Sequence, residues 1–177
     1  MRTALNIARV AILALMATSG SGLAQGSGAE ARLKQLNITL PADSAPAANF
    51  VNSVQAGKLL SISGNTPGGQ WPLKGKVGKD LTVEQGYQSA RQTGLIMLTK
   101  VRTALGSLDR VKRIVKVLGM VNSADGFSDQ PKVVNGFSDL MVEVFGEAIG
   151  KHARSAVGMA GLPGNAPVEV EMIVEVE

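Results

Sequence analysis

Two kinds of side chain near the C-terminus of this chain could carry out chemistry together. Arg154 presents a guanidinium, whose planar fork of N–H groups can bind a carboxylate through two parallel hydrogen bonds. Glu169 and Glu171 place two carboxylates on one side of an extended segment. A carboxylate with a raised pKa can deprotonate an attacking water and protonate a departing nitrogen, as hydrolysis of a C=N bond requires. A structural interpretation is also open: Arg154 is a surface residue or pairs with Glu169 or Glu171, and both glutamates form a solvated strand face.

Other kinds of active site have little support in the residue types present. His152 is the only histidine, so no Ser–His–Asp or Cys–His arrangement can exist without it, and we interpret it as a loop residue before a strand. No cluster of His, Cys and carboxylate residues suggests a metal site. The glycines of residues 64–69 are not followed by the Lys-Ser/Thr pair of a phosphate-binding loop.

The N-terminus has the pattern of a secretory signal peptide. Arg2 and Arg9 accompany a short apolar core, Val10 to Met16, and Gly22 and Ala24 are the small residues that a signal peptidase requires. This core is too short for a membrane helix, which needs roughly 20 apolar residues. We therefore expect residues 1–24 to be a signal peptide, the protein to be periplasmic or secreted, and no membrane association after cleavage.

Composition bounds what the remaining chain can be. Residues 25–177 suit one domain, and without any Cys this domain must rest on packing and oligomerisation. The chain has 18 Lys and Arg; without Arg2 and Arg9, 16 remain against 14 Asp and Glu. This near balance, with scattered aromatic residues, argues against a nucleic-acid partner.

The pattern of residue types predicts an α+β domain after an N-terminal extension over residues 25–47. A capping box, Thr82 with Gln85, begins a helix that Gly106 ends, and Asp129 can cap a second helix. The long segment 64–79, rich in Gly, is predicted to be a loop of the kind that often forms a lid. The predicted elements are a short helix at 30–36, strands at 50–55 and 58–63, a helix at 83–105, a strand at 111–121, a helix at 131–149, and strands at 154–161 and 168–177.

This β-β-α-β-α-β-β order implies a mixed sheet with two amphipathic helices on one face. The last strand alternates strictly, with apolar residues from Val168 to Val176 on one side and mainly glutamates on the other. The two helices cannot cover the second face. We therefore expect the uncovered face to close against other copies of the chain.

Several motifs along the chain carry a family resemblance. Residues 153–163 read ARSAVGMAGLP, an Ala-Arg-small opening with a later Leu-Pro, and residues 168–172 read VEVEM. Residues 63–67 read SGNTP, similar to Ser-Gly-Gln-x-Pro, and Val134-Asn135 lies in a predicted helix. Together these motifs resemble the RidA/YjgF family, also called endoribonuclease L-PSP or reactive-intermediate deaminases. The resemblance spans nearly all of residues 48–177, which we take as one domain of this type, from a divergent branch.

The resemblance implies a chorismate-mutase-like fold in which three subunits pack their sheets into a central barrel. Ligand sites would lie in the clefts between subunits. The implied activity is hydrolysis of enamines and small 2-imino acids to 2-keto acids and ammonia, with no metal or organic cofactor. The alternative is a non-catalytic trimer of the same family that binds a small carboxylate or client proteins.

The resemblance also assigns site residues. Arg154 would hold the substrate carboxylate, and Glu169 would be the catalytic carboxylate beside the attacking water. Asn135 would add one hydrogen bond from the helix, and Ser155 and the backbone near Ala156 would line the carboxylate pocket.

Two positions depart from the family pattern. Ala156 stands where well-studied members carry Cys, and Phe50 stands where they carry Tyr. Phe50 can still supply an apolar wall to the ligand pocket, but it cannot donate a hydrogen bond. The sequence therefore predicts carboxylate binding more strongly than it predicts turnover.

Overall fold

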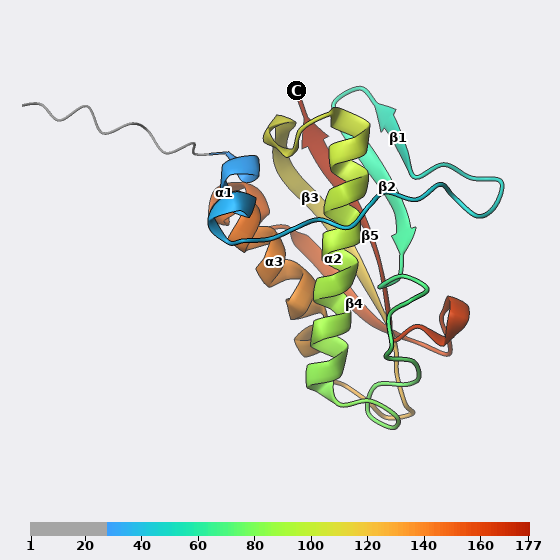
Figure 1. The fold of residues 1–177 in the computed structure, drawn as a ribbon. Coiled ribbons are helices and arrows are strands. Elements are labelled where there is room, and N and C mark those ends of the chain that lie inside the picture. Colours follow the sequence, from blue (N-terminus) through green and yellow to red (C-terminus); the bar gives the residue numbers. More distant parts are fainter. Residues whose placement is uncertain (1–27) are drawn as a thin grey trace, which may run out of the picture.

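A computed structural model describes residues 28–177, and the predicted signal peptide over residues 1–24 lies outside the described residues. Two long helices cover one face of a five-stranded mixed sheet (Figure 1). The elements are α1 (Ala29–Gln35), β1 (Ser53–Ala56), β2 (Leu59–Asn65), α2 (Val83–Leu105), the 3₁₀ turn η1 (Leu108–Arg110), β3 (Val111–Asn122), α3 (Gln130–Gly150), β4 (Ala153–Met159), the 3₁₀ turn η2 (Pro163–Asn165) and β5 (Val168–Val176). The predicted α+β class and the β-β-α-β-α-β-β order of the domain are confirmed.

The last strand of the chain is the central strand of the sheet. The strand order is β1-β2-β5-β3-β4, and β5 pairs antiparallel with both β2 and β3. The edge strand β4 runs parallel to β3, because α3 carries the chain back across the sheet between them. Consequently β4 and β5 lie close together in sequence but are separated in the sheet by β3.

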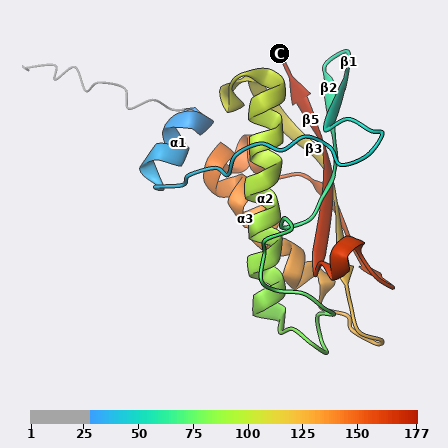
Figure 2. The same cartoon turned by 45° about the vertical axis from the view of Figure 1, so that its right-hand side comes forward.

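The alternation predicted for β5 separates the two faces of the sheet. Its apolar residues, Val168, Val170, Met172, Val174 and Val176, are buried beneath α2 and α3. Figure 2, which views the sheet more nearly edge-on, shows both long helices on the same side. The opposite face has no helix among residues 28–177 and leaves large apolar side chains exposed: Val54, Leu59, Val115 and Val157.

The two long helices differ in how they begin. Helix α2 begins as predicted: Gln85 N–H donates to Thr82 Oγ1 at 3.2 Å, and Thr82 N–H donates to Gln85 Oε1 at 2.9 Å. Asp129 precedes α3, but its side chain caps no backbone N–H, contrary to the prediction. Its ψ of 23° is not the extended conformation from which a cap side chain reaches the helix, and the carboxylate instead lies 3.1 Å from Lys132 Nζ.

The segment predicted as an N-terminal extension packs against the domain. Ala29 and Leu33 of α1 are buried, and Glu30 forms an ion pair with Arg102 of α2 at 2.7 Å. Residues 37–52, which we call the strap, then cross the outer surface of α2 (Figure 1). Lys100 of α2, only 3% exposed, donates to Asp43 Oδ1 of the strap at 2.6 Å.

The Gly-rich segment between β2 and α2 is held against the domain by contacts of Trp71, Lys76 and Val77. Trp71 Nε1 donates to Ser89 Oγ of α2 at 2.9 Å, and Val77 is fully buried. Lys76 Nζ lies 2.7 Å from the carbonyl oxygen of Ala160, beyond the end of β4. No helix within residues 28–177 has the length and apolar character needed to cross a membrane.

Helices α2 and α3 approach closely at two glycines. A Cβ on Gly94 of α2 would lie 2.8 Å from Leu140 Cδ2. A Cβ on Gly136 of α3 would overlap the backbone carbonyl oxygen of Tyr87 on α2. A side chain such as Leu140 can rotate away, whereas the backbone of α2 cannot move without disturbing the core beneath it.

We therefore predict that Gly136→Ala lowers the free energy of unfolding by about 1–3 kcal/mol, because it overpacks the helix contact. Urea denaturation monitored by circular dichroism measures this change. Gly161→Ala is the matched control, since a Cβ there meets no atom within 4 Å. Equal stability of the two variants would contradict the proposed close contact.

Candidate functional site

Arg154 extends from the edge strand β4 to helix α3. It pairs with the fully buried Val117 of β3, so its side chain points to the helix-covered face of the sheet. Its Nη1 donates to Asn135 Oδ1 at 2.9 Å and to Ser138 Oγ at 3.0 Å, and its Nη2 lies 3.5 Å from the carbonyl oxygen of Pro131. Pro131, Asn135 and Ser138 follow helical spacing, so one face of α3 supplies all three contacts.

These contacts use only part of the guanidinium. A guanidinium carries five N–H donors, and within residues 28–177 no hydrogen bond is made by Arg154 Nε. Nε–H and the adjacent Nη2–H form the side edge of the fork, which suits a bidentate carboxylate. Helix α3 therefore orients Arg154 and leaves donors for a ligand.

His152 completes the cluster around Ser138. Its Nδ1 lies 2.7 Å from the carbonyl oxygen of Gly150, and its Nε2 lies 3.0 Å from Ser138 Oγ. A carbonyl oxygen only accepts, so Nδ1 carries the proton of the neutral ring and Nε2 accepts the Ser138 hydroxyl proton. Burial is the main cause that lowers the pKa of His152, and the nearby charge of Arg154 lowers it further against the opposing effect of the Gly150 carbonyl.

A cavity of about 460 Å³ opens beside this cluster. It is lined by Ser138, Asp139, Val142, Lys151, His152 and Arg154. Its size suits a small molecule, and its cationic groups suit an anionic one. Arg154 is the member of this lining that can grip a carboxylate through two parallel bonds.

Glu169 lies on the other face of the sheet. It sits on β5 opposite Met120 of β3, and a Cβ on Gly64 would overlap Glu169 Oε1. Burial raises the pKa of Glu169, and the neighbouring charge of Glu171 raises it further. Within the described part of the chain, its carboxylate has no hydrogen bond or ion pair. Such a group is a better proton acceptor than an ordinary, solvated carboxylate.

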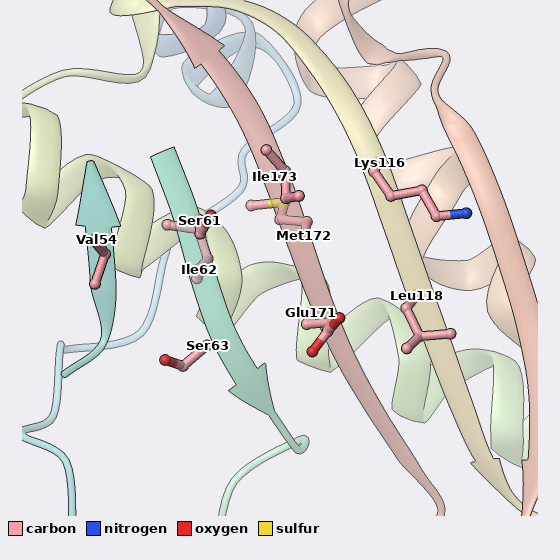
Figure 3. Close-up of a pocket in the computed structure, with 9 residues that line it drawn as sticks. All are labelled: Val54, Ser61, Ile62, Ser63, Lys116, Leu118, Glu171, Met172 and Ile173. Atoms are coloured by element: carbon pink, nitrogen blue, oxygen red, sulfur yellow. The ribbon is translucent and has the colours of Figure 1, made fainter. Parts of the chain in front are cut away.

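A second, smaller cavity of about 280 Å³ lies on this uncovered face (Figure 3). Glu171 borders it from β5, and Lys116 extends from β3 toward the edge of the sheet (Figure 3). Lys116 Nζ donates to Ser155 Oγ at 2.9 Å. Ser155 therefore points away from the cavity beside Arg154, although it is the next residue in the chain.

The structure brings together only some of the residues predicted for the site. Arg154 and Asn135 are in direct contact. Ala156 lies on the same face of β4 but packs against the core, and Phe50, 52% exposed, precedes the strand in which it was predicted. Glu169 is on the opposite face from Arg154. One copy of the chain thus holds two halves of the predicted site, which we call the Arg154 half-site and the Glu169 half-site.

Sequence reasoning missed Ser138 and gave His152 no role beyond the loop. One signal for Ser138 was available, because it lies three residues after Asn135 and so shares its helix face. The link from Ser138 to His152 depends on how α3 packs beside β4. No short sequence motif records that packing.

Comparison with known proteins agrees with this architecture. The family profile described as "YjgF/chorismate_mutase-like, putative endoribonuclease" matches residues 30–176. The chain belongs to this family. The family membership expected from the motifs and the mixed sheet expected from the order of the elements are both confirmed.

Individual relatives extend the similarity over most of the chain. Protein TCP17 of Trypanosoma cruzi is 48% identical over 149 residues, which cover 82% of this chain and 92% of that protein. A crystal structure of an Agrobacterium tumefaciens protein of unknown function is 41% identical with a TM-score of 0.75, covering 84% of this chain and 91% of that one. A Shewanella oneidensis structure with the same endoribonuclease description is 32% identical with a TM-score of 0.80, covering 84% and 99%.

Within this YjgF-family chain, the described residues contain no group of three or more His, Cys, Asp or Glu side chains that could hold a metal ion. The two half-sites contain a guanidinium, a hydroxyl, an imidazole and carboxylates. These groups can bind an anion and move protons.

The electrostatics of His152 give a testable titration. Because burial and Arg154 both lower its pKa, we expect the ring of the folded protein to titrate below the ordinary value of 6.5. Arg154→Ala should raise the midpoint, whereas Arg154→Lys should keep it low because the charge remains. NMR of the single histidine measures both, and a midpoint at or above 6.5 in the unaltered protein would contradict the placement of the ring.

The same titration predicts the pH dependence of stability. The unfolded chain binds more protons at His152 than the folded chain does, since the folded pKa is lower. The stability that the neutral ring contributes is therefore complete above pH 6.5 and is lost as the pH falls toward the folded pKa. Urea unfolding of the unaltered protein and of His152→Gln between about pH 5 and 7 checks this sign, because the variant should lack this part of the slope.

Proposed function

We propose that this protein hydrolyses the C=N bond of small 2-imino acids and their enamine tautomers, giving 2-keto acids and ammonia. The observation that carries the proposal is the pair of half-sites: an oriented Arg154 with donors to spare, and a Glu169 carboxylate without a partner in the described chain. Membership in the YjgF family supports the fold around the site. The functional groups of the two half-sites support the proposed hydrolysis.

Binding of the substrate carboxylate is the first step. Arg154 lines the cavity beside α3, and two parallel charge-assisted bonds from its Nε and Nη2 would fix the plane of a carboxylate bound there. Asn135 and Ser138 hold Nη1 on its other side, so the fork is oriented before the ligand arrives.

Proton transfer by Glu169 is the second step. Its raised pKa allows the carboxylate to take a proton from water as the oxygen attacks the carbon of the protonated imine. The product of this step is a neutral carbinolamine. Glu169 then returns its proton to nitrogen as the C–N bond breaks. The hydroxyl proton of the carbinolamine leaves with the departing ammonia, which becomes ammonium.

Joining the two steps in one site requires a second copy of the chain, because Arg154 and Glu169 lie on opposite faces of one sheet. The uncovered face of that sheet exposes Val54, Leu59 and Val157, which association would bury. We propose a homotrimer in which the Arg154 half-site of one copy meets the Glu169 half-site of the next. With the signal peptide predicted over residues 1–24, we also propose that the protein acts outside the cytoplasm.

A second candidate is a binding protein for small carboxylates without turnover. The Arg154 half-site is complete within one copy, so it can bind an anion without Glu169. Ala156 packs against the core and Phe50 carries no polar group, so neither adds a proton donor. Measured carboxylate binding with no release of ammonia from any imino acid would favour this candidate.

The proposed activity predicts different kinetic effects for the two half-sites. With 2-imino acids generated in the assay, Arg154→Ala should raise KM about 10- to 100-fold, the value of a charge-assisted pair. Glu169→Gln should lower kcat about 100-fold or more, because it removes the proton acceptor. Release of ammonia and keto acid is the measurement. Arg110→Ala, an exposed arginine at η1, serves as the control, and equal rates for it and Arg154→Ala would refute the assignment.

The intersubunit site makes a further prediction. Arg154→Ala and Glu169→Gln protein, unfolded together and refolded as mixed trimers, should regain activity that neither variant shows alone. Random mixing in equal amounts would restore an intact pair at about a quarter of the interfaces. A monomeric mass in solution, or no regained activity in mixed trimers, would contradict a site shared between copies.

A further inference from the structure

Ser138 occupies a position in the Arg154 half-site that carboxylate binding alone does not require. Its hydroxyl oxygen accepts a hydrogen bond from Arg154 Nη1 at 3.0 Å, and its proton is directed to His152 Nε2 at 3.0 Å. Asn135 already holds the same Nη1 at 2.9 Å. Ser138 and His152 both line the open cavity, so this chain of groups ends at a surface that a ligand can reach.

The hydrogen-bond directions leave one site on Ser138 unused. A serine oxygen accepts through two lone pairs, and Arg154 takes one of them. The hydroxyl proton goes to His152, because Nδ1–H of that ring donates to the Gly150 carbonyl at 2.7 Å. A ligand hydroxyl in the cavity can therefore donate to the second lone pair. The resulting order is ligand O–H, then Ser138 O–H, then His152 Nε2.

We propose that Ser138 and His152 form a proton relay that accepts the hydroxyl proton of the carbinolamine when the C–N bond breaks. This inference rests on the proposed function, because it assigns the acceptor for one proton of that reaction. Ser138 is the group that touches the substrate, and His152 acts through it.

The proton balance of the step is complete. Glu169, protonated when water attacked, gives its proton to nitrogen as the C–N electron pair leaves with ammonia. The hydroxyl proton moves to Ser138 Oγ while the Ser138 proton moves to His152 Nε2, and the C=O bond of the keto acid forms. The imidazolium then protonates the departing ammonia, which restores the neutral ring. The overall change is protonated imine plus water to keto acid plus ammonium.

The surroundings of His152 favour a base that accepts a proton briefly. The charged groups that line the same cavity are Asp139 from α3, Lys151 just after α3 and Arg154 from β4, and Tyr87 donates to the Asp139 carboxylate at 3.0 Å. Its ring and the ring of Phe137 pack in a T-shaped arrangement, with ring centroids 6.3 Å apart. A half-buried ring beside a cation remains neutral and returns a proton readily.

Kinetics of four variants test the relay. Ser138→Ala and His152→Gln should each lower kcat about 100-fold while KM changes less than about threefold, since Arg154 keeps its contact with Asn135. Ser138→Thr, which retains the hydroxyl, should recover most of the rate. Ser107→Ala, at the start of η1, is the matched control and should match the unaltered protein. In that protein kcat should also fall on the acid side as His152 and Glu169 protonate, and His152→Gln should keep only the part of this fall that Glu169 causes.

A measurement that needs no turnover accompanies the kinetics. Because His152 is the only histidine, NMR of its ring reports one unambiguous signal. Pyruvate, used as the carboxylate probe, should shift this signal in the unaltered protein, and Arg154→Ala should abolish the shift. Ser138→Ala should shift the Nε2 resonance even without pyruvate, because the hydroxyl donor is removed.

The outcomes separate the two proposals. An inactive unaltered protein would overturn the proposed function and the relay with it. An active protein in which Ser138→Ala and His152→Gln keep kcat would overturn the relay alone. In that case the hydrogen bond between Ser138 and His152 only stabilises the packing of the start of β4 against α3. Urea unfolding of both variants would then show a loss of stability without a loss of rate.

Discussion

The alternation of β5 at the centre of the sheet is the constraint on which the rest of the structure depends. Every second residue from Val168 to Val176 lies beneath the two long helices, so the residues between them must face away from the core. Glu169 and Glu171 are thereby held on the uncovered face, while β4 presents Arg154 to α3 on the covered side. A shift of one residue in the pairing of β5 would reverse both faces. The separation of the two half-sites follows from this register, and so does the need for a partner to unite them.

Local patterns predicted much of the fold because local interactions create it. Thr82 and Gln85 satisfy each other's backbone N–H groups within one turn, and Gly106 adopts the left-handed conformation that ends α2. The prediction for Asp129 was wrong because its backbone follows the turn before Pro131 instead of extending. The contacts of Ser138 could not be predicted in the same way, since they join α3 to the start of β4 and depend on how a helix packs beside an edge strand.

Contacts in the structure explain why several motifs of the family resemblance contain the residues they do. Gly64, in the Ser-Gly-Asn segment, lies where any side chain would collide with the carboxylate of Glu169. Two motifs that are distant in sequence therefore meet in the structure. Gly64, near the end of β2, leaves room for the carboxylate of Glu169. Similarly, Asn135 and Arg154 belong to separate motifs and meet at 2.9 Å. Family motifs in this chain mark points of contact between elements, whereas the residues that complete those contacts, such as His152, lie outside them.

The strap over α2 protects one lysine amine, so the reactivity of that amine reports whether the strap is in place. Lys100 is 3% exposed, and its amine is enclosed by Asp43 and by the carbonyl and hydroxyl oxygens of Ser44. An amine held in this way is inaccessible to acylating reagents while the strap is in place. Surface lysines such as Lys79 and Lys112 remain open to them. The ratio of labelling at Lys100 to labelling at the surface lysines therefore measures how often the N-terminal segment detaches from a domain that otherwise stays folded.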